Sequence, residues 1–159
     1  MPSCSKPVVT LIADDDAGHA RLIEKNLARA GLPTPIQKFD NGQKVLDFLF
    51  QRGTGAHRQS GTPYFLLLDI QMPQVDGVEV LRRLKADAEL RKIPVIMLTT
   101  SDDSLEVDRC HALGCSNYVV KPVSYDRFAE VIATIGGYIS LATVPLVDGN
   151  GQATAASKF

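Results

Sequence analysis

The run Tyr64-Phe65-Leu66-Leu67-Leu68-Asp69 carries the clearest signal for the fold of this 159-residue chain. Five consecutive apolar residues that end at a carboxylate are typical of a strand buried on both faces, as in the middle of a parallel sheet. Similar short apolar runs occur before and after it in the sequence. They predict further strands at residues 8–13, 35–39, 94–98 and 117–120.

Segments whose apolar residues recur at helical spacing alternate with these strands. Asp16 and Ser124 stand where N-caps are expected, before the first and the last of these helices. The helical patterns extend over residues 20–30, 45–50, 80–84, 103–113 and 128–135. Repeated strand–helix units with right-handed connections predict an α/β fold: a three-layer α/β/α sandwich whose five-stranded parallel sheet has the order 2-1-3-4-5.

The composition is that of an ordinary globular domain, with 45% hydrophobic and 22% charged residues. We expect one domain at residues 7–141, an N-terminal extension at 1–6 and a flexible C-terminal tail at 142–159. The formal net charge is -1 and the sequence contains no basic stripe, which argues against nucleic-acid binding. No apolar run approaches the roughly 18 residues of a membrane span, and we see no secretory signal, so we expect a cytoplasmic protein.

The three cysteines do not have the spacing of a disulfide framework or of a zinc site. Cys4 stands alone near the N-terminus, and Cys110 and Cys115 lack the CxxC spacing of a four-ligand zinc site. His111 could join Cys110 and Cys115 as a metal ligand, but we expect these residues to belong to a half-buried helix instead.

Charged and polar residues stand at the ends of four of the predicted strands. Asp14 and Asp15 follow the first strand, and Asp69, Thr99 and Lys121 stand at the ends of the third, fourth and fifth. In an open α/β sheet these positions share the edge at which ligands bind. Three carboxylates gathered there repel one another unless a cation is bound, and a hard divalent ion such as Mg²⁺ suits oxygen ligands.

These residue types suit phosphoryl transfer to a carboxylate. A carboxylate can attack phosphorus and form an aspartyl phosphate, and this reaction depends mainly on positioning and on neutralising the charge of the phosphoryl oxygens. Asp69 follows the most buried strand and is therefore our candidate phosphoacceptor. Lys121 would supply positive charge, and the Thr99 hydroxyl would supply a hydrogen bond. The sequence contains no GxxxxGK phosphate loop, which argues against direct use of a nucleoside triphosphate.

The sequence resembles the receiver domains of bacterial two-component response regulators, of the chemotaxis CheY type. The resemblance covers about residues 7–141 and includes intervals of 30 residues from Asp69 to Thr99 and of 52 residues from Asp69 to Lys121. It rests on four motifs in a fixed order: LIADDD (11–16), LLLDIQMPQVDGVEVL (66–81), VIMLTTSDD (95–103) and NYVVKP (117–122). The resemblance implies a flavodoxin-like, or CheY-like, fold, whose sheet has the predicted strand order.

The resemblance implies a magnesium site and a phosphorylation site at the same edge of the sheet. Asp14 and Asp15 would be the acidic pair, with Asp15 a direct ligand of Mg²⁺. Asp69 would be both phosphoacceptor and metal ligand, and the backbone carbonyl of Gln71 would complete the protein ligands. Gln71 and Ser101 occupy the positions at which receivers tune the hydrolysis of the phosphoryl group.

The resemblance also implies how the site would switch. Thr99 and Tyr118 look like the switch pair of receivers, in which the hydroxyl moves toward the phosphoryl group and the aromatic ring turns inward. Lys121 would pair with the phosphoryl group, and a cis peptide bond is implied between Lys121 and Pro122.

A stand-alone response regulator, rather than an enzyme with a turnover reaction, is the function that follows from the resemblance. A sensor histidine kinase would donate the phosphoryl group to Asp69, and the receiver would catalyse this transfer itself and lose the group slowly. The surface of helix four, strand five and helix five would bind a downstream protein or a second copy of the chain. The motif DNGQKVLDFLFQRG (40–53), the loop after it and ALGC (112–115) resemble regulators paired with phytochrome kinases.

Three alternative functions share parts of this pattern. A haloacid-dehalogenase-type phosphatase also uses a strand-end Asp, a Thr or Ser, a Lys and Mg²⁺, but it needs a second Asp where Gln71 stands. A flavodoxin-like flavin carrier would have the same architecture, but three aspartates would repel the flavin phosphate. A receiver-like scaffold that works without phosphate would not need the complete set of phosphorylation residues found here.

Overall fold

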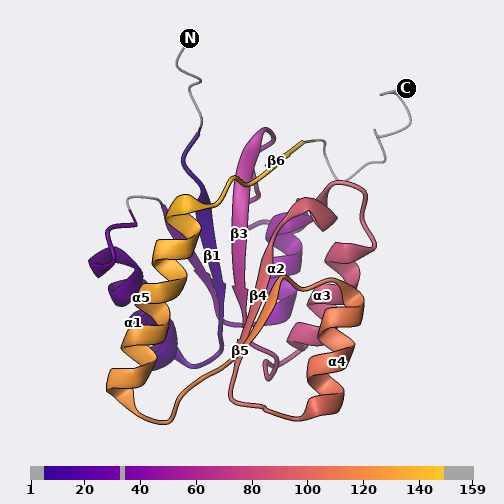
Figure 1. Cartoon of the computed structure of the whole chain (residues 1–159). Coiled ribbons are helices and arrows are strands. Elements are labelled where there is room, and N and C mark those ends of the chain that lie inside the picture. The colour runs from indigo at the N-terminus through magenta and orange to yellow at the C-terminus, as the bar shows by residue number, and fades with distance from the viewer. Residues whose placement is uncertain (1–5, 33–34, 149–159) are drawn as a thin grey trace.

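The computed structural model describes residues 6–32 and 35–148 and has the predicted α/β/α architecture (Figure 1). Its parallel sheet has the predicted strand order β2-β1-β3-β4-β5. These strands are β1 (Val9–Ala13), β2 (Ile36–Phe39), β3 (Thr62–Leu68), β4 (Val95–Thr99) and β5 (Asn117–Val120). Because every pairing among them is parallel, their carboxyl ends lie at one edge of the sheet.

Within the described residues, α1 and α5 cover one face of the sheet, and α2, α3 and α4 cover the other (Figure 1). The helices are α1 (Ala17–Arg29), α2 (Gly42–Leu49), α3 (Gly77–Lys85), α4 (Ser104–Leu113) and α5 (Tyr125–Leu141), with a 3-10 helix at Leu90–Lys92. Asp16 and Ser124 are the N-caps of α1 and α5, as predicted, because their side chains accept hydrogen bonds from backbone N–H groups of the first turn.

The buried strand that decides the fold is β3, in which every residue is buried. Phe65 and Leu67 pack with the helices of one face, and Leu66 and Leu68 pack with those of the other. Burying a side chain of this size contributes about 1.5–3 kcal/mol to stability. The two faces together hold β3, and therefore the residue that follows it, Asp69, in a fixed position.

Helix α5 continues through Gly136 and Gly137, where the sequence pattern weakens. Gly136 is buried against α1: a Cβ atom at this position would lie 3.0 Å from the Ala30 Cβ and 3.3 Å from a Leu27 methyl group. The missing side chain therefore allows α5 and α1 to pack closely. This close packing offsets the low helix propensity of glycine.

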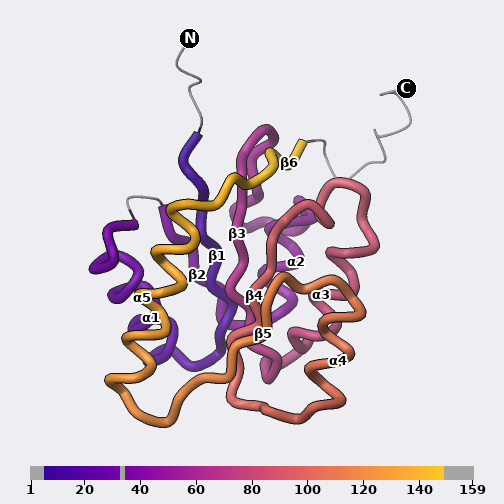
Figure 2. The backbone as a smooth tube through the Cα atoms, viewed as in Figure 1, coloured from indigo at the N-terminus to yellow at the C-terminus, as the bar shows by residue number. Residues whose placement is uncertain are grey.

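A flexible tail is predicted from the sequence at residues 142–159, and this prediction is wrong at residues 146–147, which form a strand. A short strand, β6 (Leu146–Val147), pairs antiparallel with β3 at Thr62 and Pro63. Figure 2 shows the chain crossing from the end of α5 over the start of β3. Residues 149–159, and residues 1–5 of the predicted N-terminal extension, lie outside the described residues.

Polar contacts attach the β6 segment to the rest of the protein. The Gly61 N–H donates to the Val147 carbonyl at 2.8 Å, and the Asp148 N–H donates to the Glu89 carboxylate at 2.9 Å. Arg58 is buried and donates to the Leu49 and Asp148 carbonyls, at 2.8 and 3.4 Å. Arg58 lies in the loop between α2 and β3, and its buried side chain joins the end of α2 to the C-terminal segment.

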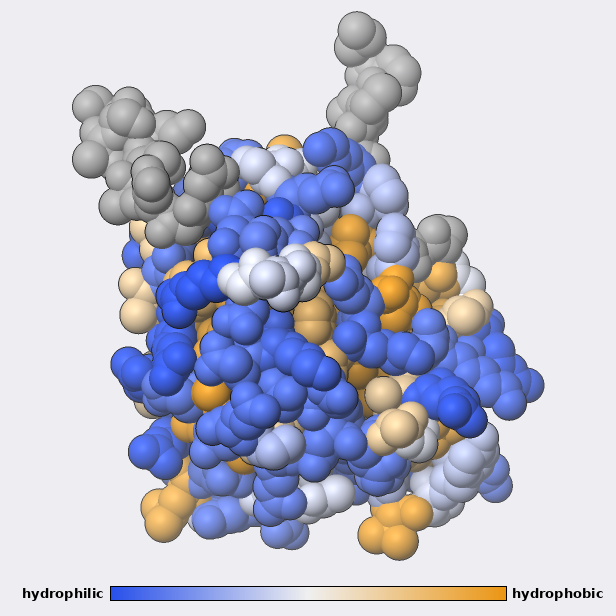
Figure 3. Space-filling model, turned by 180° about the vertical axis from the view of Figure 1, so that it is seen from behind, coloured by the Kyte–Doolittle hydropathy of each residue, from blue (hydrophilic) through white to orange (hydrophobic). Residues whose placement is uncertain are grey.

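The surface seen from behind is mainly hydrophilic, with small separate hydrophobic areas (Figure 3). Among the described helices, none has both the length and the hydropathy needed to cross a membrane. The large apolar side chains that are exposed belong to α4, to β5 and the residues after it, to α5 and to β6: Leu105, Val120, Val123, Tyr125, Tyr138, Leu141 and Leu146.

We predict that Val147→Ala lowers the free energy of unfolding by about 1.5–2.5 kcal/mol, because it removes two buried methyl groups and leaves a cavity. Val147 is 0% exposed, whereas its neighbour Leu146 is 48% exposed. Leu146→Ala is therefore the matched control and should change stability by less than about 0.5 kcal/mol. Urea unfolding followed by circular dichroism measures both variants. Equal effects of the two substitutions would show that β6 does not pack as described.

Candidate functional site

Three carboxylates meet at the carboxyl ends of β1 and β3. Asp14, Asp15 and Asp69 each offer an oxygen atom, and these atoms lie within 4.8 Å of one another. Asp14 and Asp69 are buried and Asp15 is exposed. The structure thus brings together the three carboxylates that the sequence predicts as metal ligands.

The backbone around Asp69 is fixed by a close approach of α3 to the end of β3. The Ile70 N–H donates to Asp69 Oδ1 at 2.8 Å, and the Gly77 N–H donates to the Ile70 carbonyl at 2.8 Å. A Cβ atom on Gly77 would lie only 2.0 Å from the Asp69 carbonyl oxygen. Only glycine fits at this position, and the loop after β3 is therefore held against the site.

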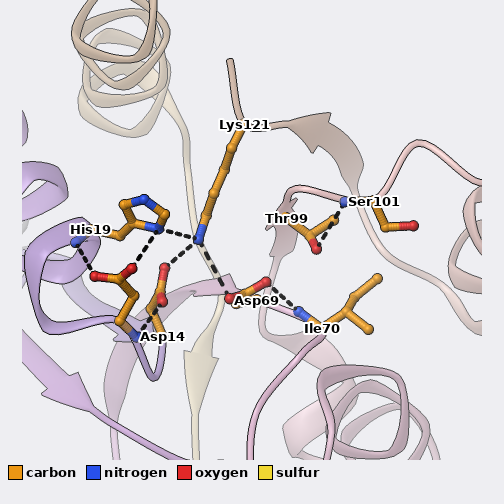
Figure 4. Close-up of polar contacts among 8 residues, drawn as sticks. Asp14, His19, Asp69, Ile70, Thr99, Ser101 and Lys121 are labelled. Carbon is orange, nitrogen blue, oxygen red and sulfur yellow. Dashed lines mark hydrogen bonds and ion pairs between the residues drawn. The ribbon is translucent and has the colours of Figure 1, made fainter. Parts of the chain in front are cut away.

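Lys121 comes from the end of β5 and points its ammonium group at the carboxylates (Figure 4). Its Nζ atom lies 2.6 Å from Asp14 Oδ2 and 3.4 Å from Asp69 Oδ2, and the side chain is almost completely buried. When all three carboxylates are ionised, the single charge of Lys121 leaves an excess of negative charge. A hard divalent cation on the carboxylate oxygens would neutralise this excess, so the residues fit Mg²⁺.

The carboxyl group of Asp14 is subject to two opposing effects. Burial raises its pKa above the ordinary value, and the hydrogen bond and charge of Lys121 oppose that rise. Asp14 Oδ1 also accepts a hydrogen bond from the Asp16 N–H at 2.9 Å. Asp14 therefore interacts both with a buried cation and with the start of α1.

Thr99 and Tyr118, the predicted switch pair, lie on the neighbouring strands β4 and β5. Thr99 is fully buried, and its hydroxyl accepts from the Ser101 N–H at 3.5 Å. The Tyr118 hydroxyl donates to the Ser101 carbonyl at 2.9 Å, and the ring is half-buried. Ser101 therefore connects the two residues, although the sequence analysis considered it only in relation to hydrolysis.

Three further predictions from the sequence concern Gln71, the peptide bond before Pro122 and the cysteines, and their outcomes differ. Gln71 is in the loop after β3 with an exposed side chain, and its role as a carbonyl ligand stays a prediction. The bond between Lys121 and Pro122 is trans, so the implied cis bond is wrong for this structure. Cys110 in α4 and Cys115 after it are buried with free thiols and are not members of the acidic cluster of the described residues, and burial raises the pKa of the Cys110 thiol to about 11.

The sequence analysis did not identify His19 as part of the site. Its Nδ1 atom lies 3.1 Å from Lys121 Nζ, so the imidazole faces the same ammonium group as the carboxylates (Figure 4). The two residues are 102 positions apart in the sequence, and no local pattern predicts this contact. A cavity of about 390 Å³ is lined by Asp14, Asp15 and residues of α1, β2 and α2.

Comparison with known proteins gives the same assignment over most of the chain. Residues 10–133 match the family described as the response regulator receiver domain. The polar-differentiation response regulator DivK of Brucella anthropi is 34% identical over 131 residues, covering 82% of this chain and 98% of DivK. A receiver domain from Rhodospirillum rubrum superposes with a TM-score of 0.83 at 38% identity, covering 89% of this chain and 99% of that chain. The phosphorylated cyanobacterial phytochrome response regulator RcpA gives 0.79 at 28% identity, covering 86% and 97%.

We predict that Gly77→Ala destabilises the protein by about 3 kcal/mol, because the new methyl group would overlap the Asp69 backbone. It should also weaken binding of Mg²⁺, since the loop after β3 must move. Gly137→Ala is the control: nothing lies within 4 Å of that position, and alanine should stabilise α5 by up to about 1 kcal/mol. Thermal unfolding and magnesium titration followed by NMR measure both effects. An unchanged Gly77→Ala protein would contradict the close approach.

Proposed function

The chain belongs to the family of response regulator receiver domains, and we propose that it accepts a phosphoryl group on Asp69 from a sensor histidine kinase. Receiver domains are signalling proteins that take phosphate from histidine kinases and bind Mg²⁺ at an acidic pocket. The observation that carries the proposal is the placement of Lys121 Nζ beside a cluster of three carboxylates at the sheet edge. A cytoplasmic location fits this function and stays a prediction from the sequence.

Asp69 would act as the nucleophile of the transfer. One of its carboxylate oxygens would form a bond to phosphorus while the bond from phosphorus to the histidine nitrogen of the kinase breaks, and the imidazole would leave with the electron pair and take up a proton. Bound Mg²⁺ would neutralise charge on the transferring phosphoryl oxygens, held by Asp14, Asp15, Asp69 and the Gln71 carbonyl. The phosphoryl group would then be lost slowly to water, so the protein acts as a switch with a limited lifetime.

Lys121 and Thr99 would respond to the new phosphoryl group. Lys121 is already 3.4 Å from Asp69 Oδ2, so its ammonium group needs only a small movement to pair with a dianion there. The Thr99 hydroxyl would leave its 3.5 Å contact with the Ser101 N–H and donate to a phosphoryl oxygen. Tyr118 would lose or change its hydrogen bond to the Ser101 carbonyl, because the same loop moves.

The face formed by α4, β5 and α5 is the surface we propose for contact with a downstream partner or a second copy of the chain. Leu105 on α4, Val120 at the end of β5, and Val123 and Tyr125 at the start of α5 are all exposed there. Tyr118 belongs to the same strand as Val120. A change at the phosphorylation site would therefore reach this surface through β5.

The input signal is a finer part of the proposal. The likeness to RcpA, a cyanobacterial phytochrome response regulator, supports a phytochrome kinase as the donor, as do the sequence motifs at 40–53 and 112–115. The likeness to DivK supports no such input. Phosphotransfer assays with histidine kinases from the source genome test this part, and a clear preference for a kinase other than a phytochrome would refute it.

We predict that Asp69→Asn abolishes phosphorylation by acetyl phosphate in the presence of Mg²⁺, because an amide oxygen is not a nucleophile for phosphorus under these conditions. Asp40→Asn is the matched control and should react like the unchanged protein, since Asp40 is an exposed carboxylate outside the acidic cluster. Phosphate-affinity electrophoresis and intact-protein mass spectrometry measure the phosphorylated fraction. An Asp69→Asn protein that still gains a phosphoryl group would refute the assignment.

We expect beryllofluoride with Mg²⁺, which mimics the aspartyl phosphate, to shift the protein to a dimer in size-exclusion chromatography. Val123→Ser should reduce this shift without destabilising the fold, because the Val123 side chain is fully exposed. Tyr138→Ser, which changes an exposed residue at the other end of α5, is the control and should dimerise normally. A monomer under all conditions would leave a separate protein as the partner and contradict self-association.

A further inference from the structure

We infer that His19 is a positioning residue that fixes the ammonium group of Lys121 through a hydrogen bond accepted by its Nδ1 atom. The inference rests on the proposed function, because it gives His19 a part in phosphoryl transfer to Asp69. Its structural basis is the 3.1 Å distance between Lys121 Nζ and His19 Nδ1.

The direction of this hydrogen bond follows from the chemistry of lysine. A protonated amine has three N–H donors and no acceptor, so the imidazole nitrogen that faces it must carry a lone pair. A hydrogen bond from Lys121 therefore requires the His19 tautomer in which Nδ1 is unprotonated and Nε2 carries the proton. Asp16 Oδ2 is more distant from Nδ1, at 3.7 Å, and a carboxylate there could pair only with a protonated Nδ1.

The imidazole ring is held by both helices of one face of the sheet. His19 is in the first turn of α1, where its backbone N–H donates to the Asp16 cap at 3.1 Å. Its ring meets the buried Phe128 ring of α5 edge to face, with 5.6 Å between the ring centroids. The Nδ1 atom is thus directed toward Lys121, and 37% of the His19 side chain remains accessible.

His19 differs from the other two partners of Lys121 in one respect that matters for catalysis. Asp14 and Asp69 also accept from Lys121, but both are proposed ligands of Mg²⁺. With Mg²⁺ bound, these two carboxylates would interact with both the metal and the lysine. His19 lies outside the acidic cluster of the described residues, so its hydrogen bond to Lys121 does not compete with metal binding. It can hold the ammonium group in place while the carboxylates bind the cation.

Two substitutions separate this role from simple packing. His19→Asn would place an amide oxygen where Nδ1 lies and remove the ring, whereas His19→Phe keeps the ring contact with Phe128 and removes the acceptor. We expect the rate of phosphorylation by acetyl phosphate with Mg²⁺ to fall about tenfold in His19→Phe and to stay within about twofold of the wild type in His19→Asn. Lys25→Ala, which changes an exposed residue on the same helix, should react normally.

The opposite pattern would overturn the inference. If His19 serves only to pack against Phe128, then His19→Phe retains the rate and His19→Asn loses it. Equal rates in all variants would also refute the positioning role. If the wild-type protein is not phosphorylated at all, the proposed function fails, and the contact between His19 and Lys121 is then decided by the next measurement.

The tautomer of His19 can be measured in the wild-type protein itself. Long-range ¹⁵N–¹H NMR spectra of the histidine-labelled, metal-free wild type should show His19 with an unprotonated Nδ1 and a protonated Nε2. The signal is assigned by its absence from the His19→Phe spectrum, since the chain has three histidines. A proton on Nδ1 would refute the hydrogen bond from Lys121 and with it the inference.

Discussion

The contact of the Lys121 ammonium group with Asp14 and Asp69 is the interaction on which the rest of the site depends. Buried charges are tolerated only when opposite charges and hydrogen bonds surround them, and this lysine and both carboxylates are buried. The three residues follow β5, β1 and β3. Their meeting therefore requires the parallel register of the sheet, in which these strands end at the same edge. Charge compensation at the edge and hydrophobic packing of the strands support the same arrangement.

The acidic cluster keeps its geometry because its central member, Asp69, follows a strand that is buried along its whole length. β3 is buried along its whole length, and Gly77 allows the start of α3 to approach the Asp69 backbone directly. The chain neighbours of Asp69, Leu68 and Ile70, are both buried in the hydrophobic cluster that includes α2, α3 and α4. Catalysis of phosphoryl transfer relies on such prior positioning, since the carboxylate, the metal and the ammonium group need little reorganisation when the donor arrives.

Most of this arrangement could be predicted from the sequence, because it follows from signals that are local. The apolar runs that end at Asp14, Asp69 and Lys121 indicate both the strands and the edge at which these residues meet. The β6 strand could not be predicted in this way, since two residues carry no periodicity and Val147 is buried through contacts with elements distant in the sequence, namely β3 and the 3-10 helix at Leu90–Lys92. The same holds for Arg58 and His19. Arg58 contacts Asp148, 90 positions away, and His19 contacts Lys121, 102 positions away, whereas a polar side chain in a loop or first helical turn ordinarily indicates exposure.

The strands β3 and β5, on two sides of the site, differ in how fully their residues are buried. This difference indicates where movement is easiest. Every residue of β3 is buried, whereas in β5 the outer residues Asn117 and Val120 are exposed and the middle ones are half-buried. Moving β5 therefore disrupts less packing than moving β3, and local displacements occur where few buried contacts are lost. Lys121 continues from β5, and Tyr118 lies within it. A phosphoryl group on Asp69 would thus be accommodated by a movement of β5 rather than of β3. The displacement of β5 would reach the surface that this strand shares with α4 and α5.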